Sequence, residues 1–128
     1  MMRIDIKSNK PLYEQIISNI KENVLKGYLN PGDELPSIRR MAMELSVTPG
    51  TVAKAYQELE RTKIIETIRG KGTYIASDID MKRVDNDKLE AIEKELTNQL
   101  LELIYMGMSK DDVRELIERL YENLKKED

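Results

Sequence analysis

The stretch VTPGTVAKAYQELE, residues 47–60, limits the fold most, because residue type alone indicates both where a helix starts and which face it buries. Thr48 is a good N-cap, and Pro49 suits the first helical position, where its missing N–H is not needed. Apolar residues then recur at i, i+3, i+4 and i+7, namely Val52, Ala55, Tyr56 and Leu59. The opposite, free face is predicted to carry Gly50, Thr51, Lys54, Gln57 and Arg61.

Two further helices are predicted upstream. The first begins with Pro11 at its first position, and Gly27 is placed to stop it. Its apolar stripe is Leu12, Ile16, Ile17, Ile20 and Val24. A tight turn at Pro31 and Gly32 follows. Ser37 then caps a second helix whose apolar residues are Ile38, Met41, Ala42 and Leu45, leaving Arg39 and Arg40 near its exposed N-terminal end.

Only Ser46 and Val47 separate the second helix from the third, which is the spacing of a helix-turn-helix. In a helix-turn-helix, the later of the two helices points the free N–H groups of its N-terminus at phosphate. Here that helix is the third one. Gly50 costs about 1 kcal/mol relative to Ala in a helix interior and less near an end. Close approach of the backbone to DNA is one reason for a glycine there.

A β-hairpin is predicted next, with strands IIETI (64–68) and TYIA (73–76) joined by Arg69-Gly70-Lys71-Gly72. A hairpin after a helix-turn-helix is a wing, which commonly contacts phosphates or the minor groove. A nucleotide-binding loop is disfavoured, because the glycine four residues before a Gly-Lys pair is missing and Lys71 precedes Gly72. The predicted fold class is therefore mainly α with a small β-hairpin, a winged helix-turn-helix domain.

Composition excludes several classes of function. The 128 residues include no Cys and no His, so thiolate or imidazole metal sites and catalysis by either residue type are excluded. No pair of acidic residues is placed for general acid–base chemistry. We expect no enzyme activity, no cofactor and no metal. No apolar run reaches the roughly 20 residues that span a bilayer, so a cytoplasmic protein is expected.

Charge is divided unevenly along the chain. Residues 1–77 hold 12 Lys and Arg against 9 Asp and Glu, whereas residues 78–128 hold 9 against 15. The first part is thus net positive and the second net negative, which suggests that only the first part meets a polyanion. Alone, this asymmetry is weak, because a net charge of +3 over 77 residues is ordinary.

The second part reads as a polar linker, residues 77–87, followed by two amphipathic helices separated near Gly107. Ser109 and Asp112 resemble a capping box at the start of the last helix. The main apolar positions are Leu89, Ile92, Leu96, Leu100, Leu103, Val113, Leu116, Ile117, Leu120 and Leu124. Two such helices cannot cover both apolar faces, so a symmetric homodimer is expected. The predicted domains are residues 1–77, which bind DNA, and residues 78–128, which combine the linker with a two-helix dimerisation region.

A small-molecule effector site is a further alternative in the second part. Tyr105, Met106, Met108 and Tyr121 would line it. Met and Tyr at helical spacing are more often core residues, and the core interpretation is favoured.

Four segments in register, PLYEQI, PGDELPSIRRMA, TVAKAYQELE and GKGTYIA, resemble the GntR family of bacterial transcription regulators across residues 11–76. The resemblance implies that residues 48–51 with Lys54 enter the major groove and that the Gly-Lys-Gly wing enters the minor groove. It assigns DNA contacts to Arg39, Thr48, Thr51, Lys54, Lys71 and Gly72, with Arg40, Gly50 and Arg69 as neighbours.

Two positions depart from the family pattern. Many members have an Arg near the start of the recognition helix, where this chain has Pro49 and Gly50, and Lys63 replaces the glycine that often ends it. The short second part resembles the YtrA-like subgroup, whose two C-terminal helices mainly dimerise. That subgroup usually represses ABC transporter genes beside its own. We expect a repressor that binds double-stranded DNA at a palindromic operator; the alternative is a winged-helix module that binds proteins and has no operator.

Overall fold

The computed structural model describes residues 3–77 and 84–125. These residues fall into two compact units, residues 3–77 and residues 84–124, and each is described by itself. Most of the predicted linker, residues 78–83, lies outside the described residues.

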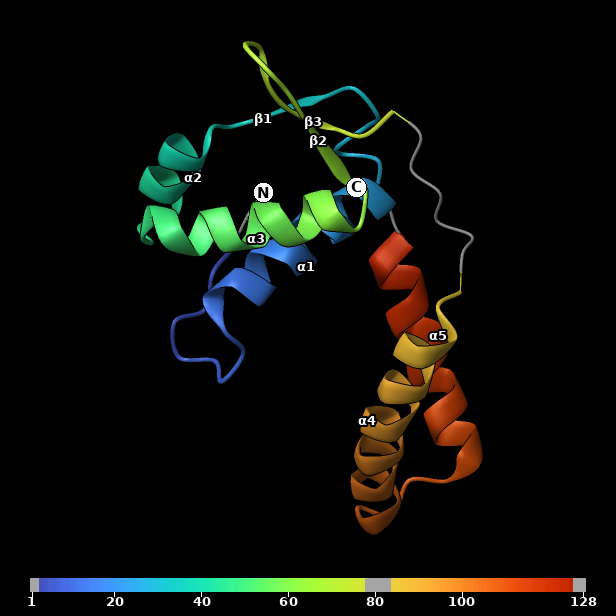
Figure 1. Ribbon diagram of the computed structural model, residues 1–128. Helices are drawn as coiled ribbons and strands as arrows, with labels where there is room; N and C mark the ends of the chain where they lie inside the picture. Colours follow the sequence, from blue (N-terminus) through green and yellow to red (C-terminus); the bar gives the residue numbers. More distant parts are fainter. Residues whose placement is uncertain (1–2, 78–83, 126–128) are drawn as a thin grey trace. The chain divides into compact units, whose positions relative to one another are not determined.

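Three helices build the first unit: α1 (Leu12–Leu25), α2 (Ile38–Leu45) and α3 (Pro49–Arg61). Figure 1 shows them gathered together, with the β2–β3 hairpin extending away from them. The apolar stripes predicted for these helices meet in one core. Its fully buried side chains include Ile16, Ile20, Val52, Ala55, Leu59, Ile65 and Ile75. Because α3 packs against both α1 and α2, the core holds one side of α3 and leaves the other exposed.

The helix starts agree with the sequence patterns, with one shift. The Ser37 hydroxyl accepts a hydrogen bond from the Arg40 N–H at 3.2 Å, and Thr48 is the N-cap of α3, in which Pro49 is the first residue. The prediction for Pro11 was wrong by one position: Pro11 is the N-cap of α1. Its ψ of 145° is extended, so the helical conformation begins only at Leu12.

Both helices of the helix-turn-helix end in a left-handed residue that is not glycine. After α3, the Ile64 N–H donates to the Leu59 carbonyl at 2.9 Å and the Lys63 N–H to the Glu60 carbonyl at 3.0 Å. This Schellman arrangement puts Lys63 at φ +64°. Ser46 takes the same role after α2, at φ +56°. Lys63, which replaces the glycine that often ends this helix, therefore ends α3 in the same left-handed conformation.

The wing is a three-stranded antiparallel sheet rather than the predicted two-stranded hairpin. Strands β2 (Ile65–Ile68) and β3 (Gly72–Ile75) form the hairpin, and β1 (Glu34–Leu35) pairs with the other edge of β3. The predicted turn at Pro31 and Gly32 precedes β1 and is closed by the Asp33 N–H, which donates to the Asn30 carbonyl at 3.0 Å. A strand of two residues is too short to show a period of two in the sequence.

The second unit contains α4 (Asn86–Tyr105) and α5 (Lys110–Lys125). Gly107, at φ +90°, ends α4 in the same Schellman arrangement, with the Met108 N–H donating to the Leu103 carbonyl at 3.1 Å. The capping box predicted at the start of α5 is confirmed. The Ser109 N–H donates to Asp112 Oδ2 at 2.9 Å, and the Asp112 N–H donates to Ser109 Oγ at 3.1 Å.

Candidate nucleic-acid interface and dimerisation surface

The first turn of α2 presents two arginines to solvent. Because Ser37 caps the helix, Arg39 and Arg40 occupy its first turn, and both side chains are exposed. Arg40 Nε lies 3.1 Å from Glu44 Oε1, one turn along the helix. Among the residues that the structure describes, Arg39 makes no ion pair or side-chain hydrogen bond. Of the two arginines, Arg39 is therefore the one whose guanidinium has no partner within the described residues.

The N-terminus of α3 is closed by its own hydroxyls. Thr48 Oγ1 accepts from the Thr51 N–H at 3.4 Å, and the two threonine hydroxyls lie 2.9 Å apart. Thr51 is half-buried, so it lies at the edge of the free face, not within it as predicted. Pro49 has no N–H, and the Val52 N–H donates to the Thr48 carbonyl at 3.4 Å, so the N–H of the exposed Gly50 is the one donor of this turn that has no partner among the described residues.

Gly50 has no structural requirement within the unit. A Cβ built on Gly50 meets no heavy atom within 4 Å, and its φ is not in the left-handed region. Packing and backbone strain therefore give no reason for a glycine in the first turn of α3. Close approach of another molecule, such as a DNA backbone, remains as a physical reason for glycine at position 50.

Lys54 is predicted to lie on the free face of α3, and the structure finds its partner on α1. Lys54 Nζ lies 4.0 Å from the centroid of the Tyr13 ring, well within the range of a cation–π contact. Tyr13 is half-buried and packs against the core. Tyr13 is not predicted from the sequence, because a single tyrosine in the first turn of a helix gives no periodic signal.

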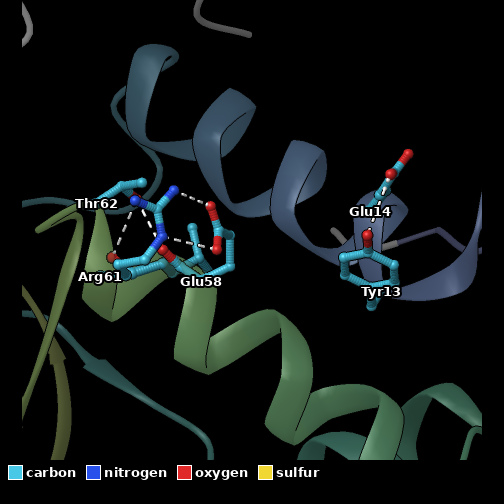
Figure 2. Close-up of polar contacts among 6 residues, drawn as sticks. Tyr13, Glu14, Glu58, Arg61 and Thr62 are labelled. Carbon is cyan, nitrogen blue, oxygen red and sulfur yellow. Dashed lines mark hydrogen bonds and ion pairs between the residues drawn. The ribbon is translucent and has the colours of Figure 1, made fainter. Parts of the chain in front are cut away.

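Arg61, also predicted for the free face, is folded back along α3. Figure 2 shows its guanidinium against the Glu58 carboxylate, with Arg61 Nε 3.0 Å from Glu58 Oε2. Figure 2 also shows the Tyr13 hydroxyl beside Glu14, 3.3 Å from its Oε1. Desolvation and the neighbouring Glu14 raise the pKa of Tyr13, and the negative charge of the half-buried Glu58 raises it further.

The tip of the wing carries two exposed cations, Arg69 and Lys71. The Lys71 N–H donates to the Ile68 carbonyl at 2.9 Å, and Gly70 adopts φ +81° inside this turn. Gly72 adopts φ +140°, and a Cβ there would lie 3.1 Å from Glu34 Oε2. The backbone conformation of the turn therefore already favours glycine at position 72, whatever the wing contacts.

The predicted dimerisation positions lie on α4 and α5, where no described side chain is buried. Those that are half-buried cluster around the turn at Gly107: Leu103, Val113 and Leu116. The others remain exposed: Leu89, Ile92, Leu96, Leu100, Ile117, Leu120 and Leu124. One copy of this unit therefore leaves an apolar surface along both helices, far more than scattered apolar residues would.

The residues considered for an effector site are also on the outside of this unit. Tyr105 is 83% exposed and Met106 75% exposed, while Met108 is half-buried beside the turn. Tyr121 is exposed as well. The core interpretation that the sequence favours for them is therefore wrong for a single copy.

Across residues 3–77 and 84–125 the structure contains no cluster of acidic side chains suited to hold a metal ion. In the same residues, none of the helices has the length and apolar character needed to span a bilayer.

Comparison with known proteins decides the family. The sequence model described as "Bacterial regulatory proteins, gntR family" matches residues 12–75, which is half of the chain. The chain belongs to the GntR family. It is a DNA-binding transcriptional regulator, and the matched residues 12–75 contain the three helices and the wing.

Individual relatives extend over both units of this GntR-family chain. It is 42% identical over 125 residues to YtrA of Bacillus subtilis, an HTH-type transcriptional repressor, covering 98% of this chain and 95% of YtrA. A crystal structure of a transcriptional antiterminator from Listeria monocytogenes has a TM-score of 0.87 at 40% identity, covering 100% of this chain and 95% of that one. A YtrA from Sulfolobus acidocaldarius, a GntR-family transcription factor, has a TM-score of 0.62 at 35% identity, covering 76% and 97%. The predicted resemblance to YtrA-like regulators is confirmed.

Proposed function

We propose that this chain is a homodimeric repressor that binds a palindromic operator in double-stranded DNA. The observation that carries the proposal is the exposed apolar surface of α4 and α5, which a second copy related by a two-fold axis would cover. A two-fold dimer presents two copies of α3. Recognition helices about one helical turn of DNA apart, roughly 34 Å, match a palindrome with half-sites in successive major grooves.

Charge supports DNA as the ligand of the first unit. The exposed cations lie where the helix-turn-helix and the wing would meet a duplex: Arg39, Arg40, Lys54, Arg69 and Lys71. In each copy, the N-terminus of α3 with Thr48, Gly50 and Thr51 enters the major groove, and the wing with Gly72 enters the minor groove. Six to ten phosphate contacts of this kind would lower affinity on the order of a thousandfold or more between low and moderate salt.

Repression and its targets rest on the relatives. The Bacillus subtilis YtrA is named a transcriptional repressor, and the similarity to it spans nearly the whole chain. We extend the proposal to repression, in the cytoplasm, of an ABC transporter operon beside the regulator's own gene. We further propose a small-molecule effector that releases the DNA and contacts the exposed Tyr105, Met106 and Tyr121.

Two measurements test the proposal. Selection of binding sites from a randomised DNA pool is expected to enrich a palindrome whose half-sites are about one turn apart. Sedimentation velocity is expected to show a dimer that Leu96→Glu converts to a monomer, because Leu96 lies in the exposed apolar stripe. Lys94→Glu on the opposite side of α4 is the matched control and is expected to stay dimeric.

The outcomes separate the parts of the proposal. An enriched site without two-fold symmetry, or a monomeric wild-type protein, would contradict the dimeric operator. Absence of any enriched site, with weak binding to all DNA, would favour the alternative of a winged-helix module that binds proteins.

A further inference from the structure

The cation–π contact between α1 and α3 bears on how Lys54 meets DNA. The free side of α3 has a middle and two edges. Gly50 and Gln57, seven residues apart, lie in the middle and are exposed, whereas Thr51 and Glu58 lie along the edge facing α1 and are half-buried. Lys54 lies between these two stripes. From its position on the helix alone, the Lys54 side chain has two possible directions in a DNA major groove. It can point toward the base edges on the floor of the groove or toward the sugar–phosphate backbone that forms its wall.

The Tyr13 ring selects one of these orientations. Lys54 Nζ lies 4.0 Å from the ring centroid, which draws the ammonium toward α1 and away from Gly50 and Gln57. The ring itself is well fixed, because Tyr13 is half-buried in the first turn of α1 and packs against the core. A lysine side chain has four rotatable bonds, so a fixed aromatic face removes much of its freedom before DNA binds.

The surroundings of Tyr13 keep its ring a neutral aromatic face. Desolvation raises the pKa of the Tyr13 phenol, and the nearby carboxylates of Glu14 and Glu58 raise it further. The hydroxyl donates a hydrogen bond to Glu14 Oε1 at 3.3 Å. The attraction between Lys54 and Tyr13 is therefore that of a cation for the ring face, which replacement of Tyr by Phe preserves.

We propose that Tyr13 is a positioning residue that holds the Lys54 ammonium at the α1 edge of α3, so that Lys54 contacts the DNA backbone and not a base edge. This inference rests on the proposed function, since it assumes that α3 enters a major groove. When α3 lies in the groove, its middle stripe faces the base edges and its edges face the sugar–phosphate walls. Sequence discrimination then belongs to the middle stripe, where Gln57 has the donor and acceptor that pair with adenine.

A DNA-free measurement tests the contact itself. The proton and carbon resonances of the Lys54 ε-methylene are expected to show a ring-current shift in the wild-type protein and in Tyr13→Phe, and to lose it in Tyr13→Leu. Unshifted resonances in the wild-type protein would overturn the inference and leave the proposed function untouched.

Binding measurements test the role. Lys54→Met removes the charge and keeps the length of the side chain, and it is expected to weaken binding to a selected operator and to scrambled DNA alike, with a salt slope reduced by about 1. Tyr13→Leu is expected to weaken both by about two- to fivefold in the wild-type background, the size of an exposed cation–π contact, and by nothing further in Lys54→Met. Tyr13→Phe is expected to bind as the wild type does. Thermal unfolding of each variant accompanies these measurements, so that a loss of folded protein is not counted as weaker binding.

Each other result has a defined meaning. Losses from Tyr13→Leu and Lys54→Met that simply add would mean that Tyr13 affects binding independently of Lys54. A loss confined to the operator in Lys54→Met would make Lys54 a base contact, and tighter binding by Tyr13→Leu would mean that the ring competes with phosphate. All three would overturn the inference. A wild-type protein that binds no DNA would remove both this inference and the proposed function.

Discussion

The Tyr56 hydroxyl donates a hydrogen bond to the Pro36 carbonyl at 2.7 Å, and so joins the middle of the recognition helix to the segment that leads from β1 into α2. Tyr56 is buried, and 20 residues of chain separate the two partners. This one bond therefore ties α3, the start of α2 and the edge of the wing together.

Loss of this bond should lower stability. Tyr56→Phe is expected to reduce the free energy of unfolding by about 1–2 kcal/mol, because it leaves the Pro36 carbonyl without its donor. Urea denaturation followed by circular dichroism measures the change. The matched control is Tyr74→Phe, whose hydroxyl makes a 3.4 Å contact with the Lys71 carbonyl at the surface. It should change stability by less than about 0.5 kcal/mol, and equal losses in the two variants would contradict the assignment.

The same residue makes stability depend on high pH. Burial raises the pKa of Tyr56 to about 12, with a further contribution from the charge of Glu44. The folded protein thus holds this proton more tightly than the unfolded chain, whose tyrosines titrate near 10. The stability from this shift is fully present below about pH 10 and is lost as pH rises toward 12. Unfolding curves of the wild type and Tyr56→Phe should therefore converge over that range, and curves that stay parallel would count against the shift.

Glycine at position 63 should stabilise the protein. Lys63 holds φ +64°, a conformation that costs a non-glycine residue about 1 kcal/mol or more. Lys63→Gly is expected to raise the free energy of unfolding by about 0.5–1 kcal/mol after the entropy of the unfolded chain is included. Lys26→Gly is the control, since Lys26 ends α1 at φ −81° and gains nothing from glycine. Thermal unfolding measures the change in stability of each variant relative to the wild type, and the two changes should have opposite signs.

The start of α5 should weaken in acid. The Ser109 N–H and then the Ser109 hydroxyl hold the pKa of the Asp112 carboxyl below its usual value. The folded carboxyl binds its proton less tightly than the unfolded one, so its contribution to stability is present above the usual carboxyl pKa and is lost as pH falls through the lowered pKa. In NMR titrations of the carboxyl carbon, Ser109→Ala should raise the pKa of Asp112, while Ser109→Thr should preserve it. An unchanged pKa in Ser109→Ala would exclude the hydroxyl as a cause.

Local signals made the helix starts in both units predictable. The helix starts at Ser37 and Thr48 and the capping box at Ser109 follow from residues within one turn of each other, so they are visible in the sequence. Contacts between distant segments were not predictable in this way. Strand β1 is two residues long, and Lys54 and Tyr13 are brought together only because α3 crosses α1.

By itself, the sequence determined which segments are helical, where they begin and which faces are apolar, because caps and periodicity act over a single turn. Only the tertiary structure decided where the charges on those helices are held. Lys54 on α3 is drawn to the aromatic ring of Tyr13 on α1. The physical reason is that a long flexible cation takes its direction from whatever partner packing brings near it, and packing joins residues far apart in the chain.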